Sequence, residues 1–396
     1  MATVTVEPPR RSRRRTSLER TPWPRRARRV LLLACLFCLA VAAVSWLPAV
    51  SGSRNLSIGI ASVEWLRSHG GNPIATQIEN WYYTLDEPGK GGPALTSLPQ
   101  VGVAADGGEG EGGSSSQAAY RPPDVNPLIH PVLHGEGVWQ KAGAGVGPRP
   151  PVLLTAFRSD PEYPRFVAGV AWIDKERAEL AYVPGLAEPP GPLEDRGAGE
   201  VPPNLRHRLV AAFNGGFPLE TSDAGLIYRG KVRETMVDGI ATVVGYRGGG
   251  FDIVRWSHGD TVPRNVRFAK QNLPPIIYEG RLNPNLSDGP AWGETVDNAT
   301  RVWRSGLGID ARGNLMYAAA DYQTVESLAE VLQRAGAVRA IELDINEDWT
   351  SFISYRRPGA REPSNLLPEM YRSPERYLSP DERDFFAVYL KPGQRW

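Results

Sequence analysis

Polar side chains occupy alternate positions in the segment RAIELDINEDW, residues 339–349, which otherwise resembles a buried strand. Because successive side chains of a strand point to opposite faces, Glu342, Asp344 and Asn346 are expected to share one face. Two carboxylates two positions apart on a strand lie roughly 7 Å from each other, by strand rise. Carboxylate pairs that hydrolyse glycosidic bonds have similar separations. A solvated sheet face is the alternative interpretation.

Two further segments carry candidate binding residues. In AAFNGGF, residues 211–217, Asn214 follows an apolar strand, and two glycines permit a tight turn or close approach to a ligand. In RVWRSGLGID, Arg304 and Ser305 enter a second buried strand, where a guanidinium can bind phosphate bidentately and a hydroxyl can add a hydrogen bond. The alternatives are an ordinary turn at Asn214 and a surface arginine at Arg304.

Several common catalytic and metal-binding patterns are absent from the sequence. No histidine follows Ser305, so a Ser-His-Asp order is excluded, and there is no HExxH pattern, Cys/His metal spacing or phosphate-binding P-loop. No metal site is therefore predicted, and the need for a cofactor stays open. Both cysteines, Cys35 and Cys38, lie in one apolar segment, so the rest of the chain contains no disulfide.

The elements that must position these residues are mostly short strands, beginning near residue 120. Glycine-rich or polar turns predict hairpins at GYRGGGFDI and LGIDARGNLMYAAAD. One helix is predicted, with Thr324 as its N-cap and Gly336 at its end. It connects the strands LMYAAAD and AIELDIN, which should run parallel through a crossover. The predicted fold class is α+β, with a mixed, largely antiparallel sheet, few helices and one strand-helix-strand crossover.

The chain before residue 120 has a different composition from the predicted domain. The uncharged run VLLLACLFCLAVAAVSWL, at about 1.5 Å per residue, is just long enough to cross a hydrocarbon core of ~30 Å. We therefore expect a single transmembrane helix before the domain. The predicted parts are a basic cytoplasmic tail (1–29), the membrane anchor (30–50), juxtamembrane helices (51–85), a flexible linker rich in Gly, Ser, Pro and Ala (86–119), and one domain (120–396).

The distribution of charge predicts the orientation of this helix. The tail has ten arginines and two glutamates, a net charge of +8, which leaves −7 for the remainder of a chain whose total is +1. Positive charge before the helix places the N-terminus in the cytoplasm and the main domain outside. A cleaved signal peptide is the alternative, because LPAVSGS offers small residues for cleavage. The net negative charge of the remainder of the chain argues against nucleic-acid binding. Arginine makes up 39 of the 45 basic residues, a bias common in high-GC bacteria, and this favours a bacterial envelope protein.

Taken in order, these segments resemble the phosphodiester glycosidase family over about residues 150–390. The shared features are the NGGF of residues 214–217, the RSGLGID of residues 304–310, the strand ending in Asp321, the helix from Thr324, and the LD pair at Leu343 and Asp344. Family members usually continue the LD pair with glycines and a serine, a loop whose amides reach the substrate. Here Ile345, Asn346 and Glu347 follow, so the chain resembles a divergent bacterial branch.

The resemblance implies a membrane-anchored extracytoplasmic hydrolase of sugar-1-phosphodiester or related envelope glycan linkages. Its expected partners are a phosphorylated glycan or cell-envelope polysaccharide and the membrane, with no nucleic acid. Asp344 would act as base or nucleophile with Glu342 as its partner. Arg304 and Ser305 would hold the phosphate, and Asn214 would bind sugar hydroxyls or phosphate. A non-catalytic glycan-binding or scaffold protein on the same fold is the alternative function.

Overall fold

The computed structural model describes residues 25–52, 58–71, 74, 89–102, 120–143, 149–193, 196–293 and 301–396. The chain divides into two compact units, residues 1–65 and residues 66–396. Four α-helices occur in the described residues: α1 (Arg25–Gly52), α2 (Ile58–Ser68), α4 (Leu219–Ser222) and α5 (Val325–Arg334). The second juxtamembrane helix, expected within residues 72–85, falls almost entirely outside the described residues.

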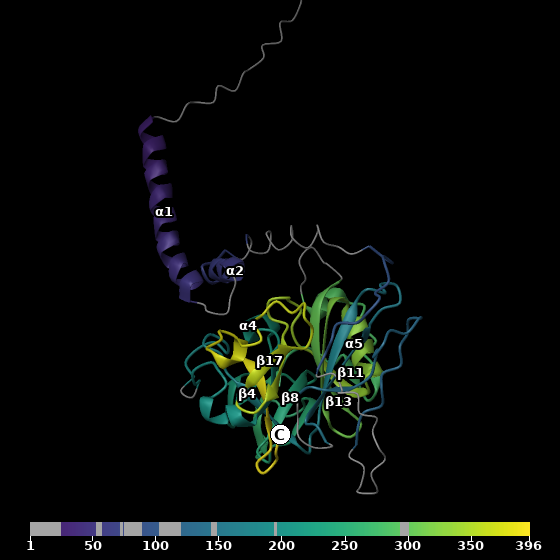
Figure 1. Cartoon of the computed structure of the whole chain (residues 1–396). Helices are drawn as coiled ribbons and strands as arrows, with labels where there is room; N and C mark the ends of the chain where they lie inside the picture. Colours follow the sequence, from purple (N-terminus) through teal and green to yellow (C-terminus); the bar gives the residue numbers. More distant parts are fainter. Residues whose placement is uncertain are drawn as a thin grey trace, which may run out of the picture. The chain divides into compact units, whose positions relative to one another are not determined.

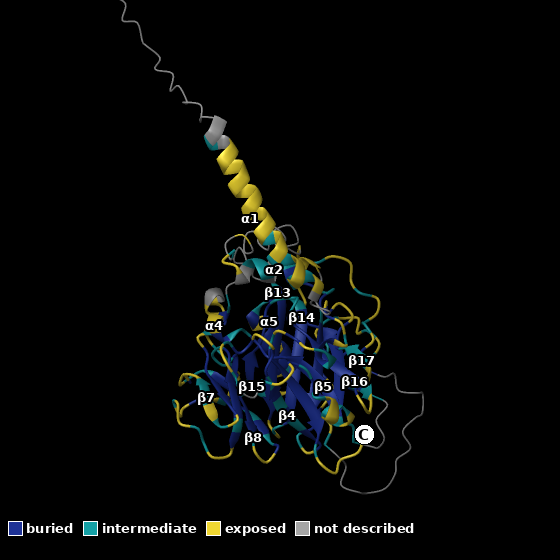
Figure 2. Cartoon of the chain, turned by 90° about the vertical axis from the view of Figure 1, so that its left-hand side faces the viewer, coloured by how far each residue is buried: buried dark blue, intermediate teal, exposed yellow. Residues whose placement is uncertain are grey.

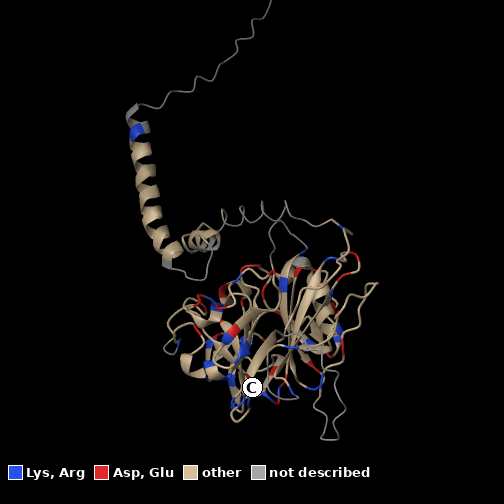
Figure 3. Cartoon of the chain, in the orientation of Figure 1, with Lys and Arg blue, Asp and Glu red and all other residues tan. Residues whose placement is uncertain are grey.

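Helix α1 has the length and composition of a membrane span. Within its segment Arg29–Ser51, an 18-residue window has a mean hydropathy of 2.7, and none of that window is buried. Figure 2 shows most of α1 in the colour of exposed residues, and Figure 3 shows almost no charged residues along it. A helix that is apolar on all sides suits a membrane or a protein core. A signal sequence near the N-terminus has the same properties.

The larger unit consists of three antiparallel sheets (Figure 1). The eight-stranded sheet has the order β1 (Gln140–Lys141), β2 (Val152–Arg158), β3 (Val167–Ile173), β14 (Leu315–Gln323), β13 (Val302–Asp310), β15 (Ala337–Glu342), β11 (Ile277–Tyr278) and β12 (Arg281–Leu282). One five-stranded sheet has the order β17 (Arg361–Asn365), β16 (Phe352–Arg357), β5 (Leu209–Asn214), β18 (Phe385–Leu390) and β4 (Ala178–Val183). The other has the order β7 (Lys231–Glu234), β6 (Leu226–Tyr228), β10 (Val266–Gln271), β8 (Ala241–Tyr246) and β9 (Phe251–Arg255). Short 3-10 helices are η1 (Pro203–Arg208), η2 (Gly289–Trp292) and η4 (Arg376–Leu378).

The predicted fold class is confirmed, including the crossover. Strands β14 and β15 both pair antiparallel with β13, so they run in the same direction on either side of it. Helix α5 connects them and packs against all three strands. Its start is fixed by a reciprocal cap, in which Thr324 Oγ1 accepts from Ser327 N and Ser327 Oγ accepts from Thr324 N, both at 3.0 Å. The β8–β9 and β13–β14 hairpins are also as predicted.

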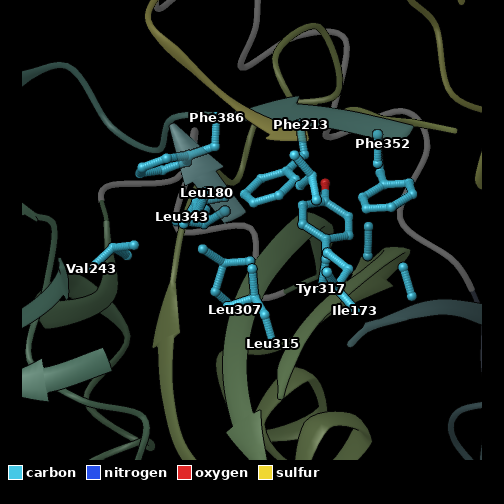
Figure 4. Close-up of a cluster of buried hydrophobic side chains, with 14 of the residues drawn as sticks. Ile173, Leu180, Phe213, Val243, Leu307, Leu315, Tyr317, Leu343, Phe352 and Phe386 are labelled. Carbon is cyan, nitrogen blue, oxygen red and sulfur yellow. The ribbon is translucent and has the colours of Figure 1, made fainter. Parts of the chain in front are cut away.

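Two hydrophobic cores define the two faces of the eight-stranded sheet. A central core lies among the three sheets and includes the neighbouring rings of Phe213, Tyr317 and Phe352 (Figure 4). A second core lies beneath α5. Leu307 of β13 belongs to the central core, whereas a Cβ atom at Gly306 would lie 3.1 Å from Leu332 of α5. Glycine at this position therefore lets α5 pack directly on the backbone of β13.

The described part of the predicted linker, residues 89–102, packs on the larger unit. Val101 is 5% exposed and lies in the central core. The amide of Gly91 donates to the carbonyl of Glu162 at 2.9 Å, and the carbonyl of Gly89 accepts from Arg165 at 2.9 Å. These fourteen residues are thus held against the domain that follows, and the boundary at residue 120 remains a prediction.

Candidate active site

The predicted site residues lie where strands of all three sheets end or begin. β5 ends at Asn214, β10 at Gln271 and β15 at Glu342, while β13 begins at Val302 and β18 at Phe385. Side-chain hydrogen bonds connect the residues at these strand ends. The site is therefore built from segments that are far apart in sequence and close only in the folded domain.

A β-bulge ends the regular pairing of β15 before Asp344. The amide of Leu343 donates to the carbonyl of Ser305 at 2.7 Å, and the amide of Ser305 donates to the carbonyl of Asp344 at 2.9 Å. Two residues thus lie opposite one, an arrangement that redirects a side chain. The strand ends at Glu342 rather than at Asn346, so the regular alternation predicted for this segment stops two residues before Asp344.

Ser305 and Asn214 hold the bulge in place through buried hydrogen bonds. The Ser305 hydroxyl donates to the carbonyl of Asp344 at 3.1 Å and accepts from the Asp344 amide at 3.2 Å and from Asn214 Nδ2 at 3.1 Å. Asn214 Oδ1 accepts from the Tyr317 hydroxyl at 2.9 Å and from the Ser351 amide at 3.2 Å. Asn214 is 3% exposed and Ser305 is fully buried. The polar atoms of both side chains therefore form hydrogen bonds within the protein, and these bonds position the backbone of Asp344.

The carboxylate of Asp344 is buried but has a positively charged neighbour. Arg383 Nη2 lies 3.2 Å from Asp344 Oδ2, and the amide of Asn346 donates to Asp344 Oδ1 at 3.1 Å. Burial raises the pKa of Asp344 above its ordinary value, while Arg383 opposes part of that increase. A carboxyl group whose pKa is raised towards neutral pH is a stronger base, which suits proton transfer.

Glu342 pairs with Arg304 on the α5 face of the sheet. Arg304 Nη1 donates to Glu342 Oε1 at 2.6 Å, and Arg304 Nε donates to the carbonyl of Gln323 at 2.9 Å. Burial raises the pKa of Glu342, Arg304 lowers it, and the charge of Asp344 raises it further. The Asp344 carboxylate is therefore close enough to affect Glu342 electrostatically. Glu342 Oε2 is buried and has no hydrogen-bond partner.

Two residues that the sequence interpretation missed complete the site. Asn272 Nδ2 donates to the carbonyls of Glu342 and Leu343 at 2.6 and 2.8 Å, and its Oδ1 accepts from the Phe217 amide at 2.9 Å. It thereby connects the NGGF loop to the bulge. Arg383 is the second missed residue. Asn272 directly follows strand β10, VRFAKQ, whose alternation of apolar and polar residues is a weaker signal than the apolar run before Asn214.

A buried ion pair supports the other side of the NGGF loop. Lys270 contacts Asp384 in a pair that is almost completely buried, and the Tyr182 hydroxyl donates to Asp384 Oδ2 at 2.7 Å. The amide of Gly215 donates to the carbonyl of Asp384 at 3.2 Å. A Cβ atom at Gly215 would overlap the Asp384 carboxylate, so the chain needs glycine there. Among the described residues, no group of three or more His, Cys, Asp or Glu side chains could hold a metal ion.

Comparisons with known proteins bear on the same segments. Residues 207–344 match the family model described as phosphodiester glycosidase, which confirms the predicted resemblance for this part of the chain. The matched region contains all five predicted site residues, Asn214, Arg304, Ser305, Glu342 and Asp344. No curated protein matches the sequence.

Solved structures also align with the chain. The catalytic domain of zebrafish N-acetylglucosamine-1-phosphodiester alpha-N-acetylglucosaminidase, auto-inhibited by its pro-peptide, aligns at 17% identity with a TM-score of 0.40, covering 63% of this chain and 87% of that one. A hypothetical protein from Synechocystis aligns at 12% identity with a TM-score of 0.36, covering 61% of this chain and 62% of that one.

Proposed function

We propose that this chain, which carries a phosphodiester glycosidase domain at residues 207–344, hydrolyses sugar-1-phosphodiester or related glycan linkages of a cell envelope. The observation that carries the proposal is the position of Asp344. A bulge, a buried hydroxyl and a buried amide side chain fix its backbone, while Arg383 contacts its carboxylate. Such fixed placement at the meeting point of several strands is what a catalytic carboxylate requires.

In the proposed reaction the bond between the anomeric carbon and the phosphodiester oxygen breaks. The phosphate monoester leaves with the bonding electrons, and the oxygen of water becomes the new hydroxyl of the sugar. A phosphate whose charge is neutralised leaves readily, so strong general-acid assistance is less necessary than for an ordinary glycoside. Asp344 serves as the base that activates water or as the nucleophile at the oxocarbenium-like centre.

The other predicted residues support Asp344 in this scheme. Ser305 and Asn214 were expected to bind substrate, but their polar atoms are used within the protein, so we assign them to positioning. Arg304 was expected to hold the phosphate. It is bonded to Glu342 and to a backbone carbonyl, so we assign it to orienting Glu342. The charge of Asp344 in turn raises the pKa of Glu342.

The activity is tested with the full chain in detergent and a glucose-1-phosphate methyl diester as substrate. The wild-type protein should release glucose, and Asp344→Asn should lower kcat by several orders of magnitude, as expected for an essential carboxylate. Asp252→Asn is the matched control, because Asp252 lies on β9 of another sheet and its ion pair with Arg339 is 34%/31% exposed. If Asp344→Asn hydrolyses the diester as fast as the wild type, the assignment is wrong.

One observation favours the alternative, a non-catalytic glycan-binding or scaffold protein. Both oxygens of the Asp344 carboxylate already have partners, Arg383 and the Asn346 amide. Asn346 also stands where the family usually has glycine. A binding protein would show saturable protection against thermal unfolding by the diester without releasing sugar. An enzyme would release sugar.

We also propose that α1 anchors the chain in the membrane, with its N-terminus in the cytoplasm and the domain outside. Its apolar segment is long enough to span, and positive charge precedes it. Mass measurement of the chain from fractionated cells tests this proposal. An anchored protein keeps residues 1–50 and sediments with membranes, whereas a mature chain that begins near residue 50 would identify a cleaved signal peptide.

A further inference from the structure

Three arginine side chains surround one buried tryptophan next to Asp344. The guanidinium carbons of Arg372, Arg376 and Arg383 lie 5.1, 5.2 and 4.7 Å from the centre of the Trp349 ring. Each distance is within the range of a cation–π interaction. We call these four residues the Trp349 arginine cluster. All four follow residue 344, where the match to the family model ends.

The ion pairs of the cluster leave Arg372 poorly compensated. Asp381 binds Arg376 through two hydrogen bonds of 2.6 and 3.3 Å, and Arg383 lies 3.2 Å from Asp344. Arg372 lies 3.5 Å from the same Asp381 carboxylate and donates to the carbonyl of Asp348 at 3.4 Å. Its side chain is 3% exposed, and a buried charge that shares its counter-ion with a second, closer arginine is only partly compensated.

Two donors of the cluster are also unused. The Nε atoms of Arg372 and Arg383 are buried and have no hydrogen-bond partner among the described residues. Buried polar groups without partners are rare, because each loses its hydration without replacement. Burial and the neighbouring Arg376 lower the pKa of Arg372 to about 10, although the charges of Asp381 and Asp348 act in the opposite direction. An anion beside Arg372 and Arg383 would satisfy both donors and the charge.

We propose that the Trp349 arginine cluster binds the phosphate group of the substrate, with Arg372 and Arg383 as the donors. This inference rests on the proposed function. It gives the phosphate a binding site that Arg304 cannot supply, because the Arg304 guanidinium is hydrogen-bonded to Glu342. Guanidinium groups bind phosphate oxygens bidentately. Arg383 is the most accessible arginine of the cluster, at 15% exposed, and it also contacts Asp344. The anomeric carbon of a bound diester would therefore lie near the Asp344 carboxylate.

Binding is measured by the thermal unfolding of the full chain in detergent, titrated at constant ionic strength with inorganic phosphate and with glucose 1-phosphate. Both ligands should raise the Tm of the wild type above its value in chloride, since a ligand that binds only the folded state stabilises it. Arg372→Lys and Arg383→Lys keep the charge but remove the Nε donors, and each should weaken both ligands about tenfold. Arg312→Gln is the control, because Arg312 also stacks on a ring, that of Tyr120, but is exposed.

The outcomes separate this inference from the proposed function. If neither ligand raises the Tm of the wild type, the cluster is not a phosphate site, and this result requires no variant to fold. If both ligands bind equally well to the wild type and the lysine variants, the phosphate site lies elsewhere and the inference is also wrong. Phosphate binding without hydrolysis of the diester would support the cluster and refute the proposed function. Hydrolysis of the diester without phosphate binding at the cluster would support the proposed function and refute this inference.

Discussion

Arg383 Nη2 lies 3.2 Å from the carboxylate of Asp344 and also donates to the carbonyl of Gly216 at 2.9 Å. One guanidinium group thus connects the end of the β15 segment to the glycine loop after β5. It also supplies the positive charge closest to a carboxylate that is otherwise buried. This relationship makes Arg383 the residue through which the charge state of Asp344 can be tested.

The variant Arg383→Gln should change the pH dependence of hydrolysis. Arg383 lowers the pKa of Asp344 against the effect of burial, so its removal raises that pKa further. Because the reactive form of Asp344 is ionised, the acidic limb of kcat/KM against pH should move to higher pH. Arg339→Gln is the control, since Arg339 pairs with Asp252. An acidic limb at the wild-type pH would show that Arg383 does not control the reacting group.

The variant Glu342→Gln should alter stability in a pH-dependent way. The pKa of Glu342 is raised in the folded protein, mainly by burial, so the folded state holds this proton more tightly than the unfolded state does. The stability from this group is complete below the unfolded pKa of about 4.3 and is lost as the pH rises through the folded value. The free energy of unfolding of wild type minus variant should therefore fall as the pH rises above about 4. Urea titrations of both proteins measure this difference, and a difference that rises with pH would contradict the direction of the shift.

The variant Asn272→Ala should impair catalysis by loosening the bulge. Asn272 donates to two carbonyls next to Asp344 and accepts from the NGGF loop. Loss of this positioning should lower kcat about 10²-fold, as expected for misplacement of a reacting group. The free energy of unfolding should also decrease by about 1–3 kcal/mol, because both carbonyls lose a donor. Asn285→Ala, at an exposed position, should change neither quantity. If Asn272→Ala folds and its kcat equals that of the wild type, Asn272 does not position the reacting group.

The variant Asp381→Asn should destabilise the domain most strongly near neutral pH. It leaves the buried Arg376 without its closest counter-ion, which costs about 3–5 kcal/mol. Burial alone would raise the pKa of Asp381, but Arg376 and Arg372 lower it below its ordinary value. The stability from this pair is therefore present above the unfolded pKa of about 3.9 and is lost as the pH falls through the folded value. Denaturant unfolding at several pH values should show the two proteins converging in acid, whereas exposed Glu369→Gln should match the wild type throughout.

Local signals in the sequence were sufficient for many elements of the fold. Helix α5 was predictable because its cap, its apolar spacing and its terminal glycine all lie within thirteen residues. The β8–β9 and β13–β14 hairpins were predictable because their turns are encoded between adjacent strands. The crossover followed from the order of strand, helix and strand. The sequence did not show that β13 lies between the two strands, since pairing between distant segments leaves no local pattern.

The candidate site was predictable only as a set of residues. The sequence by itself identified Asn214, Arg304, Ser305, Glu342 and Asp344 as polar residues within or beside apolar strands. It also determined an apolar N-terminal helix after a basic tail. Only the tertiary structure decided the partners: Arg304 with Glu342, Ser305 with Asn214, and Arg383 with Asp344. Those partners depend on a bulge and on packing among three sheets, so residues separated by as many as 167 positions, Gly216 and Arg383, come into contact through the whole fold.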